Sequence, residues 1–267
     1  MTETLHSLEP DPERAREIAE RGLILRTTVG SVVHGLSNPG TDDRDELGVC
    51  VEPPEYLLGT RRFEHFVYRT QPEGHPSGPG DLDLTVYGLR KFCGLAMKGS
   101  PTVLLPLYVE GEHLLVTTEA GERLRALAPE FVARSTGRAF LGYLDAQRRG
   151  LVGERHATRT RELSQRHGYD TKYAMHALRI AHQGIELLTD GVITLPVGEP
   201  ARSELRAVRS GEVPLDDVLA RLEKATAELE AATQRPGLAE RPDAAKVDAF
   251  LVEAYREAWA AGRHAAA

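Results

Sequence analysis

The residues best suited to chemistry are two carboxylates and a glycine–serine pair in the N-terminal part of the chain. Asp43 and Asp45 are separated by one residue, a spacing that places both carboxylates on one face of a strand. Gly30 and Ser31 follow an apolar segment, so the backbone N–H groups of the turn that they open can face an anion. Carboxylate oxygens are the ligands that Mg²⁺ prefers. A turn that binds an anion, followed by paired carboxylates, is what a protein that handles a nucleoside triphosphate requires.

A third carboxylate for such a site is expected from a neighbouring strand. Residues 81–87 alternate polar and apolar side chains, which predicts a strand with Asp81 and Asp83 on one face. We choose Asp83 as the third metal ligand and keep Asp81 in reserve. Two plainer explanations stand beside this hypothesis: the pair on 81–87 is also typical of a solvated strand face, and Asp42 and Asp43 could simply cap a turn.

The elements that must position these residues follow from apolar periodicity and from turn signals. We expect an α/β (α+β) core with a mixed β-sheet over residues 1–118, followed by an all-α C-terminal domain over residues 119–267. The predicted strands are 23–29, 45–52, 62–69 and 81–87. The predicted helices are 11–22, 88–98, 119–128, 130–150, 170–189, 214–233 and 244–261.

One predicted helix of the C-terminal domain presents cations on a single face. Lys172, His176 and Arg179 are spaced i, i+4, i+7, and Asp170 can cap the helix in front of them. A cationic face of this kind could bind phosphates. It is also ordinary surface chemistry, and a single histidine there more often satisfies a hydrogen bond than binds a ligand.

Two further helical stretches concern partners. The net charge of −7 argues against broad nucleic-acid affinity, yet the segment from Arg148 to His167 has a local formal charge of +4. This segment could hold an RNA backbone, or it could be a solvated helix face. The apolar spacing from Leu215 to Leu229 indicates packing within the chain or a homodimer contact. The basic segment contains Arg148, Arg149, Arg155, Arg159, Arg161 and Arg166, with Glu154 and Glu162.

Composition bounds the class of protein. Hydrophobic residues make up 41% of the chain and charged residues 27%, values typical of soluble globular proteins. We expect no membrane span, because no apolar run approaches ~20 residues, and no secretion, because no signal-peptide pattern is present. Cys50 and Cys93 are expected to be buried free thiols in a reducing cytoplasm. Two cysteines without metal-ligand spacing exclude a zinc framework.

Together these motifs resemble the DNA polymerase β-like nucleotidyltransferase superfamily, whose signature is Gly-Ser, a spacer, Asp-x-Asp and a later acidic strand. More narrowly, the chain resembles the bacterial and phage branch of predicted nucleotidyltransferases associated with RNA repair. It departs from that branch at His34, where tyrosine is common, and at Leu105, where a glutamate is expected. The further segments that match the branch are His34–Gly35, Asp45–Val49, Leu89–Phe92 and Gly168–His176.

The resemblance implies a Mg²⁺-dependent nucleotidyltransferase that transfers a nucleoside monophosphate from an NTP to an acceptor hydroxyl and releases pyrophosphate. It implies two Mg²⁺ ions, which Mn²⁺ can replace, and an RNA end as acceptor, such as that of a tRNA. A protein or a small molecule such as an aminoglycoside stays open as acceptor. The residues that the resemblance assigns to metal binding and catalysis are Asp43, Asp45 and Asp83, and those that it assigns to the nucleotide are Gly30, Ser31, His34, Lys172 and His176.

Two other classes of function compete with this one. The first is a catalytically silent module that binds a nucleotide or RNA; the presence of all three acidic positions argues against it. The second is a ribonuclease built on the helical part, for which Arg161 and His167 are the candidate residues.

Overall fold

The computed structural model describes residues 8–37, 42–71, 75, 78–152 and 166–262. Its sheet is mixed, as predicted, and has one strand more than the four predicted, with the strand order β3-β4-β2-β1-β5. The pair β2 and β4 is parallel and the other neighbours are antiparallel. The strands are β1 (Leu23–Val29), β2 (Arg44–Cys50), β3 (His65–Arg69), β4 (Leu82–Gly88) and β5 (Leu114–Thr117).

The central strand β2 decides where the polar site can lie. From Leu47 to Cys50 every residue of β2 is buried, as expected for a strand covered on both faces, whereas Arg44 is exposed and Asp45 half-buried. The chain therefore leaves the core at the start of β2. Two carboxylates, one just before the strand and one at its second residue, lie at this edge.

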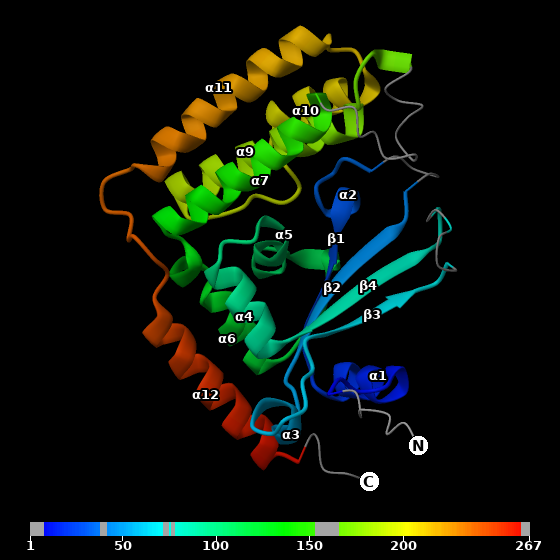
Figure 1. Cartoon of the computed structure of the whole chain (residues 1–267), viewed down its shortest axis with the longest axis vertical. Coiled ribbons are helices and arrows are strands. Elements are labelled where there is room, and N and C mark those ends of the chain that lie inside the picture. Colours follow the sequence, from blue (N-terminus) through cyan, green and yellow to red (C-terminus); the bar gives the residue numbers. More distant parts are fainter. Residues whose placement is uncertain (1–7, 38–41, 72–74, 76–77, 153–165, 263–267) are drawn as a thin grey trace, which may run out of the picture.

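Helices cover both faces of the sheet (Figure 1). Helix α1 (Pro12–Arg21) begins at Asp11, whose side chain accepts a hydrogen bond from the N–H of Arg14, and it packs on one face through Ile18. Helix α4 (Leu89–Met97) packs on the opposite face through Phe92 and Cys93. The other helices of this part are α2 (Gly30–Val33), α3 (Pro54–Leu57), α5 (Pro101–Leu104) and α6 (Glu119–Ala126).

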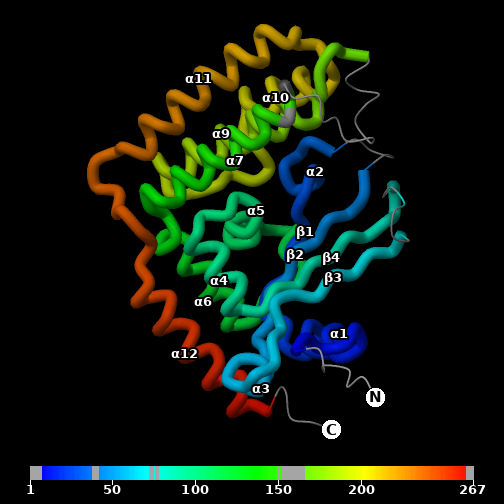
Figure 2. Tube along the Cα trace, viewed as in Figure 1, coloured from blue at the N-terminus to red at the C-terminus, as the bar shows by residue number. Residues whose placement is uncertain are grey.

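The C-terminal part is helical, as predicted. Helix α9 lies at the centre of a group that includes α7, α10 and α11, and α12 then runs back along α4 and α6 (Figure 2). The apolar side chains of α11, among them Leu222 and Leu229, are buried within this group, so their spacing serves packing inside the chain. The helices are α7 (Arg134–Val152), α9 (Thr171–Asp190), α10 (Ala201–Ser210), α11 (Leu215–Thr233) and α12 (Ala244–Ala260).

The short elements were not predicted. Strand β5 at the edge of the sheet is four residues long, too short for a periodic pattern, and α10 follows Pro200 and begins without a capping side chain. Both cysteines are free and buried, as expected. Among the described residues, no helix combines the length and the apolar character needed to cross a membrane.

A buried glutamate fixes α12 to the sheet. The hydroxyl of Tyr255 donates to Oε2 of Glu52 at 2.5 Å and accepts from the N–H of Arg90 at 3.0 Å. The N–H of Leu89 donates to the same carboxylate at 2.9 Å, and the indole N–H of Trp259 donates to the Glu52 carbonyl at 2.9 Å. Burial raises the pKa of Glu52 above its ordinary value, because it disfavours the charged carboxylate, whereas the hydrogen bonds from these donors stabilise that charged form.

Replacing Tyr255 by phenylalanine is expected to lower the free energy of unfolding by about 1–3 kcal/mol, because it leaves a buried carboxylate with fewer donors. Urea unfolding of the two proteins measures the difference. Tyr68→Phe is the matched control: Tyr68 lies on edge strand β3 and is 44% exposed. Equal effects of the two substitutions would contradict the role assigned to the Tyr255 hydroxyl.

Candidate active site

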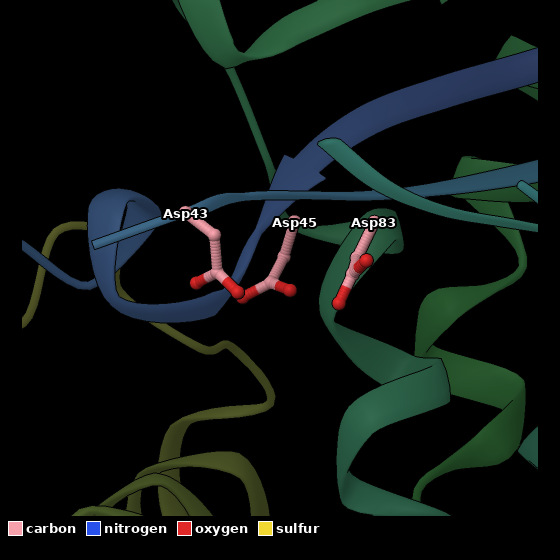
Figure 3. Close-up of side chains that lie close together, drawn as sticks. All are labelled: Asp43, Asp45 and Asp83. Atoms are coloured by element: carbon pink, nitrogen blue, oxygen red, sulfur yellow. The ribbon is translucent and has the colours of Figure 1, made fainter. Parts of the chain in front are cut away.

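Three carboxylates meet at the edge of the sheet. Asp45 on β2 is directly opposite Asp83 on β4 in the parallel register, and Asp43 lies immediately before β2. One oxygen from each of the three side chains lies within 4.8 Å of the others. Figure 3 shows the three side chains directed to the same side of the strands. Strand spacing and strand register together produce this carboxylate triad.

The reserve candidate Asp81 lies outside this triad and serves a turn. Its Oδ1 accepts from the hydroxyl of Thr70 at 2.9 Å, and its Oδ2 accepts from the N–H of Gly78 at 2.9 Å. For Asp42, the sequence left open that it only caps a turn. In the structure its carboxylate accepts a hydrogen bond from the hydroxyl of Ser31 at 2.7 Å. Asp42 therefore ties the start of β2 to the glycine–serine turn.

The triad concentrates negative charge. Burial, followed by the charges of Asp43 and Asp83, raises the pKa of Asp45 to about 6, while the Lys172 ammonium acts in the opposite direction. Three carboxylates offer oxygen ligands only, which suits a hard divalent cation such as Mg²⁺ rather than a softer metal. The donor set thus fits the metal that the sequence predicts.

Asp83 differs from the other two carboxylates in its neighbours. Its Oδ1 accepts from the side-chain amide of Gln71 at 2.8 Å and lies 3.6 Å from Nε of Arg69. Asp43 and Asp45 line a cavity between the sheet edge and the C-terminal helices, and Asp83 lies beside them without being among its lining residues. Sequence reasoning did not identify Gln71, because its contact with Asp83 depends on the path of the chain after β3.

The glycine–serine turn touches the triad directly. Gly30 begins the single turn of α2 and has φ +72°, a backbone conformation that residues other than glycine rarely adopt. A Cβ atom at this position would lie 2.1 Å from Oδ2 of Asp45. Gly30 is therefore required both by the turn and by the carboxylate that packs against it.

Gly30→Ala is expected to destabilise the protein by about 1–3 kcal/mol and to displace Asp45, with a large loss of any activity that depends on the triad. Thermal unfolding and Mg²⁺ titration of the variant measure the two effects. Gly142→Ala is the control, because a Cβ there meets nothing within 4 Å and the position lies inside helix α7. An alanine at position 30 that leaves both readouts unchanged would contradict the steric explanation.

A cavity of about 450 Å³ lies between the sheet edge and the C-terminal helices, within the ~300–1,000 Å³ range of small-molecule sites. Its walls include Gly30 and Asp45 on one side and Lys172 on the other. All five residues predicted to bind the nucleotide line it, namely Gly30, Ser31, His34, Lys172 and His176. Arg179, predicted only as part of the cationic helix face, lines it too. Lining residues that sequence reasoning did not assign are Leu36, Asp42, Gln147, Tyr173, Met175 and Arg209.

The cationic helix face is formed as predicted, with unequal exposure along it. Asp170 caps α9 by accepting from the N–H groups of Lys172 and Tyr173. Lys172 is exposed, whereas His176 is half-buried and Arg179 is buried. Arg209 lies on α10 and was missed because that helix was not predicted. The glycine after its last residue and the i, i+3 spacing of Leu205 and Val208 are the sequence signals that could have revealed the helix.

Most of the basic segment falls outside what the structure describes. Arg148 and Arg149 are exposed at the end of α7, and Arg149 forms an ion pair with Asp145 at 3.2 Å. Arg166 is exposed as well. The positions outside the described residues are Glu154, Arg155, Arg159, Arg161 and Glu162, so RNA contact there, and the pair of Arg161 with His167, stay predictions.

Comparison with known proteins adds a family. The family described as "RNA repair pathway DNA polymerase beta family", RlaP, matches residues 9–253. Among solved structures, the chain is similar to a nucleotidyltransferase-like protein from Exiguobacterium sibiricum 255-15. The identity is 14%, the match covers 92% of this chain and 80% of that chain, and the TM-score is 0.29. No curated protein matches the chain.

Proposed function

The chain belongs to the RNA repair pathway DNA polymerase beta family, and on this basis we propose that it is a Mg²⁺-dependent nucleotidyltransferase acting on an RNA end, such as that of a tRNA. The observation that supports this most is the carboxylate triad beside a cavity with cations on its far wall. A bound nucleotide needs both features, because its phosphates require cations and its reacting phosphate requires a metal. We retain residues 1–118 and 119–267 as the proposed domains, with the cavity between them.

In this proposal Asp43 and Asp45 would hold two Mg²⁺ ions, Asp83 would contribute to holding one of them, and Mn²⁺ could replace Mg²⁺. Gly30 and Ser31 bind the terminal phosphates through backbone N–H groups. When bound, Mg²⁺ neutralises charge on the phosphates and makes the acceptor hydroxyl more acidic. Lys172 and His176, from α9, approach the triphosphate from the other wall of the cavity.

The proposed reaction is an in-line displacement at the α-phosphate. The acceptor hydroxyl oxygen forms a bond to phosphorus, the bond to the pyrophosphate oxygen breaks, and the hydroxyl proton passes to the Asp83 carboxylate. The chain contributes mainly by positioning the reacting groups and by excluding water around them. The two buried free thiols support the reducing cytoplasm as the proposed location.

The test is label transfer. Purified protein is incubated with Mg²⁺, each α-³²P-labelled NTP and a total tRNA pool, with an Asp43→Ala/Asp45→Ala double variant as control. Label on RNA with wild type only is the expected result, and it also identifies the nucleotide. Label on a co-purifying protein or an aminoglycoside in parallel reactions would place the acceptor outside RNA.

Absence of transfer to every acceptor, together with Mg²⁺-independent nucleotide binding, would instead support the silent binding module. RNA cleavage without metal that is lost in His167→Ala would support the ribonuclease. Either result would replace the proposal.

A further inference from the structure

A buried cation, Arg179, lies on the wall of the cavity. Arg179 is 5% exposed and lies two helical turns after Lys172 on α9. Its Nη1 donates to Nε2 of His34 at 2.6 Å and to Oε1 of Gln183 at 2.8 Å, and its Nη2 donates to Nδ1 of His176 at 3.0 Å. Three side chains from two separate parts of the chain thus hold one guanidinium.

All three acceptors are neutral. A guanidinium can only donate hydrogen bonds, so each histidine nitrogen that faces it must be unprotonated, and each ring therefore has no net charge. Burial, followed by the charge of Arg179, lowers the pKa of His34 well below its ordinary value and that of His176 to about 3. The positive charge of Arg179 is therefore solvated by neutral groups and is not compensated by them.

Glu52, described above, is likewise held by neutral donors, whereas two other buried carboxylates of the described residues are satisfied differently. Glu46 is paired with Arg26 and Arg44, and Asp170 caps a helix. For Arg179, no carboxylate lies within ion-pair distance among the described residues. A buried charge without a counter-charge is costly, and burial accordingly lowers the pKa of Arg179 to about 10.

Arg179 also has unused donors. A guanidinium has five N–H groups. Three of those of Arg179 are donated within the described part of the chain, which leaves two for another acceptor. Since Arg179 lines the same cavity as Lys172 and Arg209, an anion inside the cavity can supply both the missing charge and the missing acceptors.

We propose that Arg179 binds the triphosphate of the nucleotide and that the nucleotide is its missing counter-charge. The proposal rests on the proposed function for the identity of the anion. The carboxylate triad on one wall excludes a bare anion there, whereas Arg179, Lys172 and Arg209 attract one to the other wall. The charge of the cavity therefore suits a ligand with a polyanionic end whose metal ions face the triad.

The experiment uses the full chain and tripolyphosphate with Mg²⁺ as the probe, measured by calorimetry and by thermal unfolding. Arg179→Met is expected to weaken tripolyphosphate binding at least about tenfold, because it removes charge-assisted hydrogen bonds. The unliganded variant is expected to melt at or above the wild-type temperature, because an uncompensated buried charge has been removed. The control is Arg138→Met, which removes an exposed arginine paired with Glu240 and should leave both readouts unchanged.

A lower melting temperature of unliganded Arg179→Met with unchanged tripolyphosphate affinity would overturn the proposal, because it would show a purely structural arginine. If Arg179→Met does not fold, Arg179→Lys, which keeps the charge, is expected to fold and to keep affinity within about tenfold of wild type. Failure of both variants to fold would overturn the proposal too. A short RNA with a terminal phosphate is tested in parallel. If Arg179→Met weakens binding of this RNA but not of tripolyphosphate, the proposal is overturned as well.

These readouts need no catalysis, so they separate this proposal from the proposed function. If tripolyphosphate binding depends on Arg179 but the protein transfers no label, the role of Arg179 is supported and the proposed nucleotidyltransferase activity is contradicted. If wild type transfers label but Arg179→Met binds tripolyphosphate as tightly as wild type, the nucleotidyltransferase activity is supported and the role of Arg179 is contradicted.

Discussion

Replacing Asp45 by asparagine is expected to reduce nucleotidyl transfer at least about 10³-fold while the protein stays folded. Asp45 lies on β2, two residues after Asp43 and directly opposite Asp83 on the neighbouring strand β4. Asparagine keeps the shape of the side chain and removes its charge, so the site loses affinity for Mg²⁺ without losing packing. Single-turnover rates and Mg²⁺ titration measure the two effects separately.

The same substitution is expected to stabilise the protein when no metal is present. The folded-state pKa of Asp45 is about 6, above the unfolded value of about 3.9, so its ionisation opposes folding. This penalty is absent below about pH 4, grows as the pH rises to about 6 and is complete above it. In EDTA, the melting temperature of Asp45→Asn should therefore exceed that of wild type by an amount that increases over this range.

Asp81→Asn is the matched control for Asp45→Asn. Asp81 belongs to the same acidic strand region, and both its oxygens accept hydrogen bonds from a turn. Its substitution should leave the rate of transfer within a few-fold of wild type. If Asp45→Asn retains activity, or if Asp81→Asn loses as much activity as Asp45→Asn, the assignment of the metal site to the carboxylate triad is contradicted.

The part of this site that strand geometry determines could be predicted from the sequence. The spacing of Asp43 and Asp45 fixes a shared face once the segment is extended, and alternation along residues 81–87 places Asp83 on a face of its strand. That β2 and β4 are parallel neighbours brings the two faces together. The mixed sheet, the helical C-terminal part and the cap of α9 by Asp170 follow from similarly local signals.

What could not be predicted depends on tertiary contacts. The cationic face of α9 indicated three similar residues, whereas the structure exposes Lys172 and buries Arg179, because His34 packs against that part of the helix from 145 positions away in sequence. Gln71 reaches Asp83 through a contact between a loop and a strand. Helix periodicity describes one element at a time, so it cannot distinguish a solvated cation from a buried one.

Asp83→Asn is expected to give a different kinetic result from Asp45→Asn: a loss of transfer of about 10²–10⁴-fold with little change in nucleotide affinity. Asp83 does not line the cavity in which the nucleotide is proposed to bind, whereas Asp43 and Asp45 do. Its proposed task is to accept the proton of the attacking hydroxyl, which asparagine cannot do. Equilibrium binding of the NTP with Mg²⁺, compared with the single-turnover rate, measures this separation.

Gln71→Leu serves as the companion variant, because it removes the amide that donates to Asp83 and keeps the carboxylate. If Asp83 acts through its proton, Gln71→Leu should change the rate by less than about tenfold, since the loss of one donor makes the carboxylate a stronger base. A loss of NTP affinity in Asp83→Asn as large as that in Asp45→Asn would instead make Asp83 a third equal ligand of the nucleotide-bound metal. The proton would then need another acceptor. The two variants together therefore decide whether Asp83 acts mainly as a metal ligand or mainly as the acceptor of the proton.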